Sequence, residues 1–201
     1  MITKKHNSEI DWMAYRRGKV SGTVLGDIIV KRGTVKKIAF YDLIAQRLGI
    51  PADDENAMVR GKRLQAEAIE RFTKETGKPV NTELITWERE DNPNMMISPD
   101  GVIDETSAVE VKCLSSSRHI EALLTQAIPK DYEYQVLQYF IISDKLEKLY
   151  FVFYDNRVLA KPFFYIEVKR ETLAEDIKTY TEYQKNILEE VNQAVLSLSN
   201  F

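Results

Sequence analysis

ISPDGVIDETSAVEVK, residues 97–112, holds two short polar motifs, Pro99-Asp100-Gly101 and Glu110-Val111-Lys112. Side chains alternate between the two faces of a β-strand, so Glu110 and Lys112 should share one face while Val111 turns into the core. If the segment that carries Asp100 lies beside that strand, two carboxylates and one ammonium group converge. The spacing therefore predicts a polar site on two neighbouring antiparallel strands.

Two converging carboxylates suit a hard divalent cation such as Mg²⁺, which takes a few carboxylate or carbonyl oxygens and otherwise water or substrate phosphate. Lys112 cannot bind that metal while charged, and would contact the attacking water or the scissile phosphate. The chemistry indicated is hydrolysis of a phosphodiester. Pro-Asp-Gly is also a common turn and Glu-Val-Lys a common exposed strand pattern, so the two motifs alone favour a purely structural interpretation.

Length and composition predict one globular domain that spans residues 1–201, since 44% of the residues are apolar and 10% are aromatic. The sequence has 28 Lys and Arg residues and 31 Asp and Glu residues, which gives a formal net charge of -3. Nothing in this balance marks a nucleic-acid-binding protein, so any basic surface has to be local.

Cys113 is the only cysteine, which excludes an internal disulfide and a cysteine-built zinc site and makes a reducing cytoplasm the expected setting. We expect its thiol to be buried on the inward face that Val111 also occupies. The first residues lack the apolar run of a signal peptide, and no apolar segment approaches membrane-spanning length, so no membrane association is expected.

Hydrophobic periodicity predicts an alternation of helices and strands. A helix that runs to about Thr76 carries a buried stripe formed by Leu64, Ala68, Ile69 and Phe72. The other expected helices cover residues 8–17, 35–48, 120–127, 131–142 and 171–198, and the expected strands cover residues 80–87, 94–103, 108–114, 149–154 and 163–168.

Two helix starts carry groups that suit phosphate. Ser21 or Thr23 could cap a helix near Arg16, and its exposed N–H groups would then bind an anion, although an ordinary helix cap explains these residues better. A basic cluster precedes the helix that ends at Thr76, where its charges oppose the helix dipole, and this modestly favours an external anion such as DNA phosphate over a solvated helix start. The cluster consists of Arg60, Lys62 and Arg63.

Tyr132, Gln135 and Tyr139 fall on one face of the helix expected at 131–142. Their polar groups can reach a common ligand, or they can belong to a half-buried helix with hydrogen-bonded amides.

Together these motifs form an ordered series from Trp12 to Gln138 that resembles the lambda exonuclease-like, YqaJ-type phage recombination nucleases, which have a PD-(D/E)XK core. The resemblance implies an α/β restriction-endonuclease-like fold with a mixed central sheet flanked by helices. The series comprises Arg16 with Val20-Ser21-Gly22-Thr23, the helix start at Gly61, Ser98-Pro99-Asp100-Gly101, Glu110-Val111-Lys112, and Tyr132 with Gln135-Val136-Leu137-Gln138.

The resemblance also implies roles for individual residues. Asp100, Glu110 and the Val111 carbonyl would hold Mg²⁺, with Mn²⁺ as a substitute, and Lys112 would position or activate the hydrolytic water. The remaining assignments are Gln135 and Tyr132 in the active-site wall, Arg16, Thr23 and Ser98 as ligands of the terminal 5′-phosphate, and Met58 as an apolar wedge between terminal base pairs. The family places a glutamate where Gln65 stands here, or Glu67 in a shifted register, so the second metal site is open.

The function implied is a Mg²⁺-dependent 5′-to-3′ exonuclease that degrades one strand of linear double-stranded DNA and leaves 3′ overhangs for recombination. The family further implies a ring-shaped homotrimer, a phage single-strand annealing protein as partner, and the cytoplasm of a bacterial host as location, with a phage or prophage as source. Two alternatives stay open: a structure-specific or restriction-type endonuclease with the same core, and a DNA-binding recombination scaffold that has lost catalysis.

Overall fold

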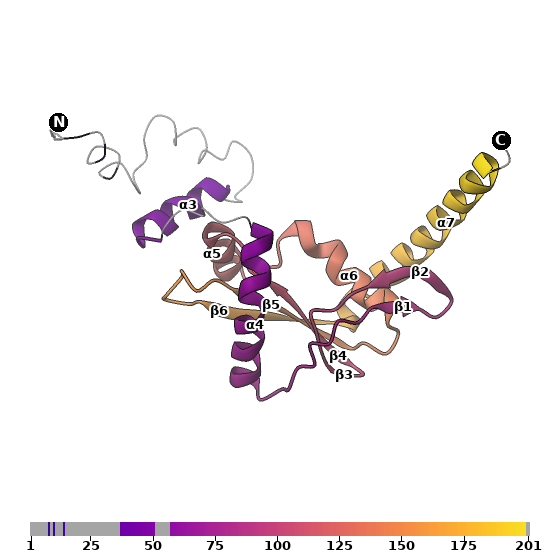
Figure 1. Cartoon of the computed structure of the whole chain (residues 1–201), viewed down its shortest axis with the longest axis horizontal. Helices are drawn as coiled ribbons and strands as arrows, with labels where there is room; N and C mark the ends of the chain where they lie inside the picture. The colour runs from indigo at the N-terminus through magenta and orange to yellow at the C-terminus, as the bar shows by residue number, and fades with distance from the viewer. Residues whose placement is uncertain (1–7, 9, 11–13, 15–36, 51–56, 200–201) are drawn as a thin grey trace. The chain divides into compact units, whose positions relative to one another are not determined.

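The computed structural model of the chain describes residues 8, 10, 14, 37–50 and 57–199 (Figure 1). The hydroxyl-rich segment around Thr23 therefore lies outside the described residues, as does the helix expected at 8–17 apart from residues 8, 10 and 14. The chain divides into two compact units, and the boundary between them falls within three elements, α4, β5 and β6. The first unit comprises Met1–Leu64, Cys113–Gln126 and Phe153–Phe164, and the second comprises Gln65–Lys112, Ala127–Val152 and Tyr165–Phe201.

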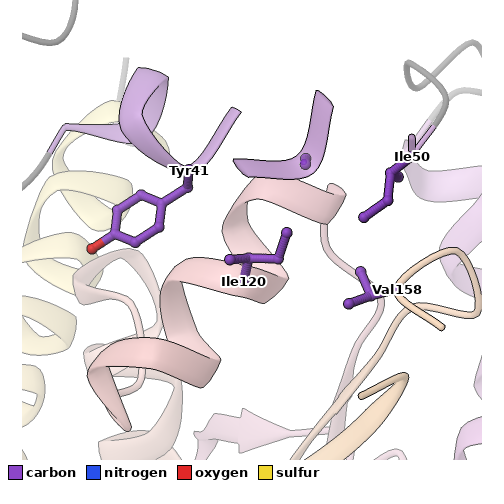
Figure 2. Packing of buried hydrophobic residues seen from close by; sticks show 5 residues of the cluster. Tyr41, Ile50, Ile120 and Val158 are labelled. Carbon is purple, nitrogen blue, oxygen red and sulfur yellow. The ribbon is translucent and has the colours of Figure 1, made fainter. Parts of the chain in front are cut away.

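Helices α3 (Ile38–Arg47) and α5 (Ser116–Thr125) pack against each other in the first unit. Tyr41 of α3 and Ile120 of α5 are buried in a common apolar cluster with Ala45, Ile50 and Val158, which Figure 2 shows from close by. Gly49 ends α3 with a φ of +72°, a conformation that costs a side chain free energy and that glycine adopts readily. The prediction of a helix at 35–48 that stops at Gly49 is confirmed.

A four-stranded sheet forms the core, in the order β3-β4-β5-β6, with bounds Gly101–Asp104, Ser107–Lys112, Lys148–Tyr154 and Phe163–Lys169. Strands β3 and β4 are antiparallel, and Gly101 lies opposite Val109. The turn between them is closed by Asp104, whose carboxylate accepts a hydrogen bond of 2.7 Å from the Thr106 N–H. The long apolar run at 149–154 lies in the central strand β5, and both central strands, β4 and β5, are buried along almost their whole length.

Helix α4 (Ala57–Thr76) covers part of this sheet through its apolar stripe, which is buried as predicted. In the second unit, the ring of Phe72 lies 5.2 Å from the ring of Tyr150 on β5 and 5.6 Å from the ring of Tyr165 on β6. The architecture is a mixed α/β fold with a central sheet and flanking helices, which confirms the predicted fold class.

Two strand predictions are wrong. The single strand expected at 94–103 is divided between β2 (Asn92–Ile97) and β3, which belong to different sheets. Strands β1 (Trp87–Arg89) and β2 form a separate hairpin, so only Trp87 of the strand expected at 80–87 is in a strand. Upstream of it, Asn81 makes a single isolated bridge to Val102. The reason is burial: Leu84 is fully exposed, so this segment has no sheet neighbour against which to bury its apolar residues.

Helix α6 (Glu133–Ile142) follows the short 3₁₀ helix η1 (Lys130–Tyr132), and α7 (Ala174–Ser199) follows η2 (Arg170–Leu173). In the second unit, α6 packs against α7 and against both strands of the β1–β2 hairpin. Among the described residues, no helix is long and apolar enough to cross a membrane.

Candidate active site

Asp100 lies in a bend directly before β3, and its side chain reaches across to β4. Its carboxylate oxygen Oδ2 accepts a hydrogen bond of 2.7 Å from the backbone N–H of Val111. This contact holds the Asp100 carboxylate beside the strand that carries Glu110 and Lys112, as the spacing of the two motifs predicts.

Gly101 is required for packing, and an ordinary Pro-Asp-Gly turn would not need glycine for that reason. A Cβ atom at this position would lie 2.3 Å from Cγ1 of Val80, which is far inside contact distance. Its φ is not positive, so the requirement is close approach and not backbone conformation. Glycine therefore lets the chain pass under Val80 and bring Asp100 against β4.

Glu110 is 2 % exposed, and three side chains donate hydrogen bonds to its carboxylate. Oε1 accepts from Nζ of Lys112 at 2.5 Å and from Nε2 of Gln135 at 2.6 Å, while Oε2 accepts from the hydroxyl of Tyr139 at 2.5 Å. Nζ of Lys112 also lies 4.9 Å from the centre of the Tyr132 ring, a cation–π distance. The prediction that Glu110 and Lys112 share a face, with Tyr132 and Gln135 beside them, is confirmed as geometry.

Gln65, in the first half of α4, also reaches this site. Its Nε2 donates a hydrogen bond of 2.9 Å to Oδ1 of Asp100. Glu67, the alternative that a shifted register would require, has an exposed side chain. Gln65 touches a carboxylate of the site, and its role as a metal ligand stays a prediction.

Burial and the neighbouring charge of Glu110 raise the pKa of Asp100 to about 6. Burial also raises the pKa of Tyr139, with the charge of Glu110 adding to the effect, so its hydroxyl stays protonated and donates to Glu110. Two carboxylates held this close in a largely buried place repel each other. A divalent cation relieves that repulsion, and this is why the donor set fits one.

The described residues contain no cluster of three or more His, Cys, Asp or Glu side chains with metal-ligand geometry. Two carboxylates together with a backbone carbonyl such as that of Val111 still match the usual protein share of a Mg²⁺ shell, which keeps several waters or substrate oxygens. The oxygen-only donor set of Asp100 and Glu110 likewise suits Mg²⁺ or Mn²⁺ over softer metals.

The other predicted site residues form no hydrogen bond or ion pair with the two carboxylates in the described part of the chain, or lie partly or wholly outside that part. Ser98 is exposed two residues before Asp100, and its Oγ lies 3.2 Å from Oγ1 of Thr86. Arg63 is exposed on α4. Met58 and Lys62 lie in α4, but their side chains are outside the described part, and Arg16 and Thr23 lie wholly outside the described residues.

Arg60 requires a correction. Its side chain is 3 % exposed in the first unit, where Nη2 lies 2.6 Å from Oδ1 of Asp155 and Nη1 donates to the Leu114 carbonyl at 2.9 Å. Although burial raises the pKa of Asp155, hydrogen bonds from Arg157 and Ser116 hold it below its usual value, so the ion pair is fully charged. A guanidinium enclosed in this way is a structural group, which does not support the predicted contact between Arg60 and DNA phosphate.

Cys113 also differs from the prediction, because its side chain is partly exposed and not buried. Tyr139 is a functional candidate for which the sequence indicated no specific partner. Its position on one face with Tyr132 and Gln135 was the available signal, but helical spacing does not reveal which group the hydroxyl meets.

A family model described as "YqaJ-like viral recombinase domain" matches residues 11–146. Among solved structures, the chain is similar to LHK-Exo in complex with dAMP, with 26% identity, a TM-score of 0.61, and coverage of 95% of this chain and 98% of that chain. It is equally similar to a second structure, titled as an alkaline exonuclease (LHK-Exo) from Laribacter hongkongensis, with 26% identity, a TM-score of 0.59, and coverage of 94% and 99%. A comparison with curated proteins finds no significant match.

Proposed function

Because the chain belongs to the YqaJ-like viral recombinase family, we propose that it is a Mg²⁺-dependent exonuclease that degrades one strand of linear double-stranded DNA from 5′ to 3′. The product would be a duplex with 3′ single-stranded overhangs, the substrate of phage-type recombination. The observation that carries the proposal is the convergence of Asp100, Glu110 and Lys112. Asp100 accepts a hydrogen bond from the backbone of β4 at Val111, and on the same strand Lys112 donates a hydrogen bond to Glu110.

The chemistry is divided among residues of the second unit. Mg²⁺ held by Asp100, Glu110 and the Val111 carbonyl would act as a Lewis acid and lower the pKa of a coordinated water. Lys112 lies between Glu110 and the ring of Tyr132, and from there its ammonium group would orient the attacking water or contact the scissile phosphate. Gln135 donates a hydrogen bond to Oε1 of Glu110 and Tyr139 donates one to Oε2, and together they keep the carboxylate in one orientation.

The direction of degradation would come from recognition of the strand end. A terminal phosphate carries more negative charge than an internal one, so a pocket of one arginine and hydroxyl groups prefers 5′-phosphorylated ends. We assign this pocket to Arg16, Thr23 and Ser98. Ser98 stands two residues before Asp100, and this adjacency supports a strand end that is gripped beside the point of cleavage.

Two further assignments follow from the family: Met58 would part the terminal base pairs, and Gln65 would contribute an amide oxygen to a second metal. Lys62 and Arg63, from the basic cluster of the sequence, would contact backbone phosphates. The proposed assembly is a ring-shaped homotrimer, and the proposed partner is a single-strand annealing protein. LHK-Exo, which is titled an alkaline exonuclease, was crystallised with dAMP, and a deoxynucleoside monophosphate is the product that we propose here as well.

The test is release of mononucleotides from linear duplex DNA in the presence of Mg²⁺, with 5′-phosphate and 5′-hydroxyl ends compared. Faster release from 5′-phosphorylated ends, loss of release in Lys112→Ala, and survival of a covalently closed circle are the expected results. Cleavage of the closed circle would indicate the endonuclease alternative. DNA binding without any strand degradation would indicate the inactive scaffold, and undiminished degradation by Lys112→Ala would refute the assigned site.

The end pocket has its own control. Arg16→Ala should remove most of the preference for the 5′-phosphate while leaving hydrolysis of the 5′-hydroxyl substrate near the wild-type rate. An unchanged preference would exclude Arg16 from the pocket.

A further inference from the structure

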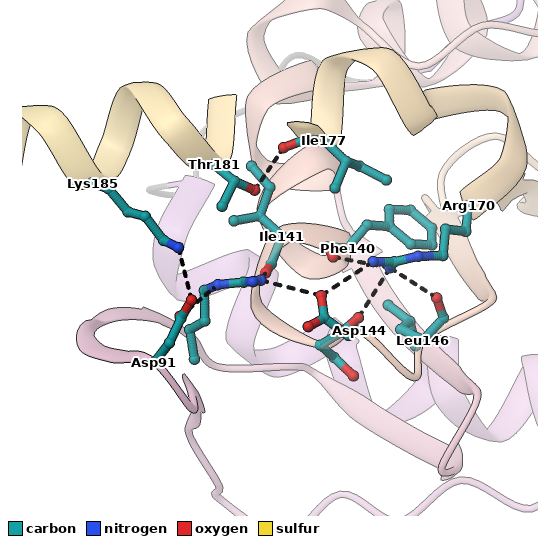
Figure 3. A network of polar contacts seen from close by, with 11 residues as sticks. Asp91, Phe140, Ile141, Asp144, Leu146, Arg170, Ile177, Thr181 and Lys185 are labelled. Atoms are coloured by element: carbon teal, nitrogen blue, oxygen red, sulfur yellow. Dashed lines mark hydrogen bonds and ion pairs between the residues drawn. The ribbon is translucent and has the colours of Figure 1, made fainter. Parts of the chain in front are cut away.

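The C-terminal end of α6 is held by two arginines from different elements (Figure 3). Nη1 of Arg170, in η2, donates hydrogen bonds to the carbonyl oxygens of Phe140 at 3.0 Å, Ser143 at 3.0 Å and Leu146 at 3.2 Å. Arg170 is half-buried, so these bonds are shielded from water. The three acceptors include the last turn of α6 and the loop that leaves it.

Arg89, at the end of β1, binds the same helix end. Its Nη1 donates to the carbonyl oxygen of Ile141 and lies 3.2 Å from Oδ1 of Asp144. Arg170 Nη2 approaches that same Asp144 oxygen at 3.5 Å, so one carboxylate bridges both guanidinium groups. Arg89 is itself oriented by Asp91, whose other oxygen accepts a hydrogen bond of 2.8 Å from Lys185 of α7.

This arrangement matches the electrostatics of a helix end. The last carbonyl groups of an α-helix have no partner within the helix, and the C-terminus carries a partial negative charge that cations stabilise. Guanidinium groups provide directional donors as well as charge. Two of them bound to backbone carbonyls restrain both the position of α6 along its axis and its rotation.

The helix so restrained is the one that carries Gln135 and Tyr139 to Glu110. Between these donors and the arginines, α6 is largely apolar, and Val136, Leu137 and Phe140 are buried. Apolar packing is not directional, whereas the hydrogen bonds at Glu110 require placement within about half an ångström. Since a helix behaves as a stiff rod over ten residues, a shift at its C-terminal end reaches Gln135 and Tyr139.

We propose that Arg89 and Arg170 form a clamp on α6 that sets the position of Gln135 and Tyr139 against Glu110, and are thus positioning residues for phosphodiester hydrolysis. The proposal rests on the function proposed above. All of its parts lie in the second unit, as does a cavity of about 850 Å³ lined by Arg89, Arg170 and Lys178 among other residues. Removing the Arg170 side chain would leave its place open to that cavity, and a small guanidinium compound could then occupy it.

The experiment compares Arg170→Ala and Arg170→Lys with the wild type, at saturating DNA and Mg²⁺. We expect kcat for mononucleotide release to fall by about 10-fold or more with KM for DNA ends unchanged, because the loss concerns placement of the reacting groups. Without DNA, the Mn²⁺ dissociation constant measured by calorimetry should rise up to about 10-fold, the lower end of the effect found when direct partners of metal ligands are lost. Ethylguanidinium should restore kcat of Arg170→Ala, while ethylammonium at equal concentration should not.

Lys178→Ala is the matched control, because Lys178 lines the same cavity and has no hydrogen bond or ion pair to α6 in the described part of the chain. It should keep the wild-type kcat and Mn²⁺ affinity. If Arg170→Ala does not fold, Arg170→Lys and Arg89→Lys carry the same comparison. Folded variants with lower melting temperatures but wild-type kcat and Mn²⁺ affinity would overturn the clamp and leave only a structural role.

Failure of the clamp and failure of the proposed function are distinguishable. An active wild type whose Arg170 variants are equally active refutes the clamp alone. A wild type without Mg²⁺-dependent DNA hydrolysis refutes the function, whatever the calorimetry of the variants shows.

Discussion

Tyr139 is the residue whose contact adds most to the site that the sequence outlines. It is fully buried, and its hydroxyl donates to Glu110 Oε2, the oxygen that neither Lys112 nor Gln135 binds. Because a buried acceptor that loses its donor costs about 1–3 kcal/mol, the orientation of Glu110 depends on this hydroxyl. The hydroxyl thus links packing in α6 to the geometry of a proposed metal ligand.

Tyr139→Phe should therefore lower kcat about 10-fold or more while the protein stays folded, since only one oxygen atom is removed. The measurement is mononucleotide release together with urea unfolding. Tyr134→Phe is the control, because Tyr134 is on the same helix but is 65% exposed and contacts Tyr180 of α7. Wild-type kcat in Tyr139→Phe would show that the remaining donors suffice to orient Glu110.

The raised pKa of Asp100 leads us to predict that the stability of the protein depends on pH. Its folded-state pKa of about 6 lies above the usual value of 3.8, so below about pH 4 both states are protonated and the stabilising effect of the raised pKa is fully present. That effect is lost as pH rises through 6, because the buried carboxylate must then ionise beside Glu110. Without metal, Asp100→Asn should thus be more stable than the wild type near pH 8, by about 1–3 kcal/mol.

Urea unfolding in the presence of a chelator, near pH 4 and near pH 8, measures this difference. It should nearly vanish at the lower pH. Saturating Mg²⁺ near pH 8 should reverse it, because a metal that binds the folded wild type stabilises that state by mass action. A wild type and variant with parallel pH profiles would contradict the assigned environment of Asp100.

At the scale of elements, the start of β3 depends on the close passage of two segments. Gly101→Ala should destabilise the protein by about 1–3 kcal/mol, because the new methyl group would overlap Cγ1 of Val80. Val80→Ala in the same chain should restore part of that loss by removing the overlapping atom. Urea unfolding of the two single variants and the double variant measures the coupling, and purely additive losses would show that Val80 does not limit the space at Gly101.

Helix α4 shows that neighbouring charges on one element can have different surroundings. The sequence places Arg60 and Arg63 in one basic cluster, yet the structure buries Arg60 against Asp155 and leaves Arg63 exposed. The two positions are three residues apart, so they are neighbours on the helix surface, and helical spacing alone does not separate them. Only the location of the core shows that Arg60 is enclosed while Arg63 stays at the surface.

At the scale of the whole molecule, the two compact units are connected through shared elements. Helix α4 and strands β5 and β6 each contribute residues to both units. We therefore predict that the chain unfolds in a single cooperative transition, as the expectation of one domain requires. Calorimetric and van't Hoff enthalpies should agree, and two separated transitions would show that the units are independent domains.

Periodicity and motif order were enough to predict the described helices, the strands β4, β5 and β6, the mixed α/β class, the family, and the shared face of Glu110 and Lys112. They predict well because alternation along a strand and repetition around a helix depend only on neighbouring residues. The pairing of residues distant along the chain required the tertiary structure, since no local pattern encodes it. That applies to Tyr139 at Glu110, to Arg60 with Asp155, to Gly101 beneath Val80, and to the two arginines at the end of α6.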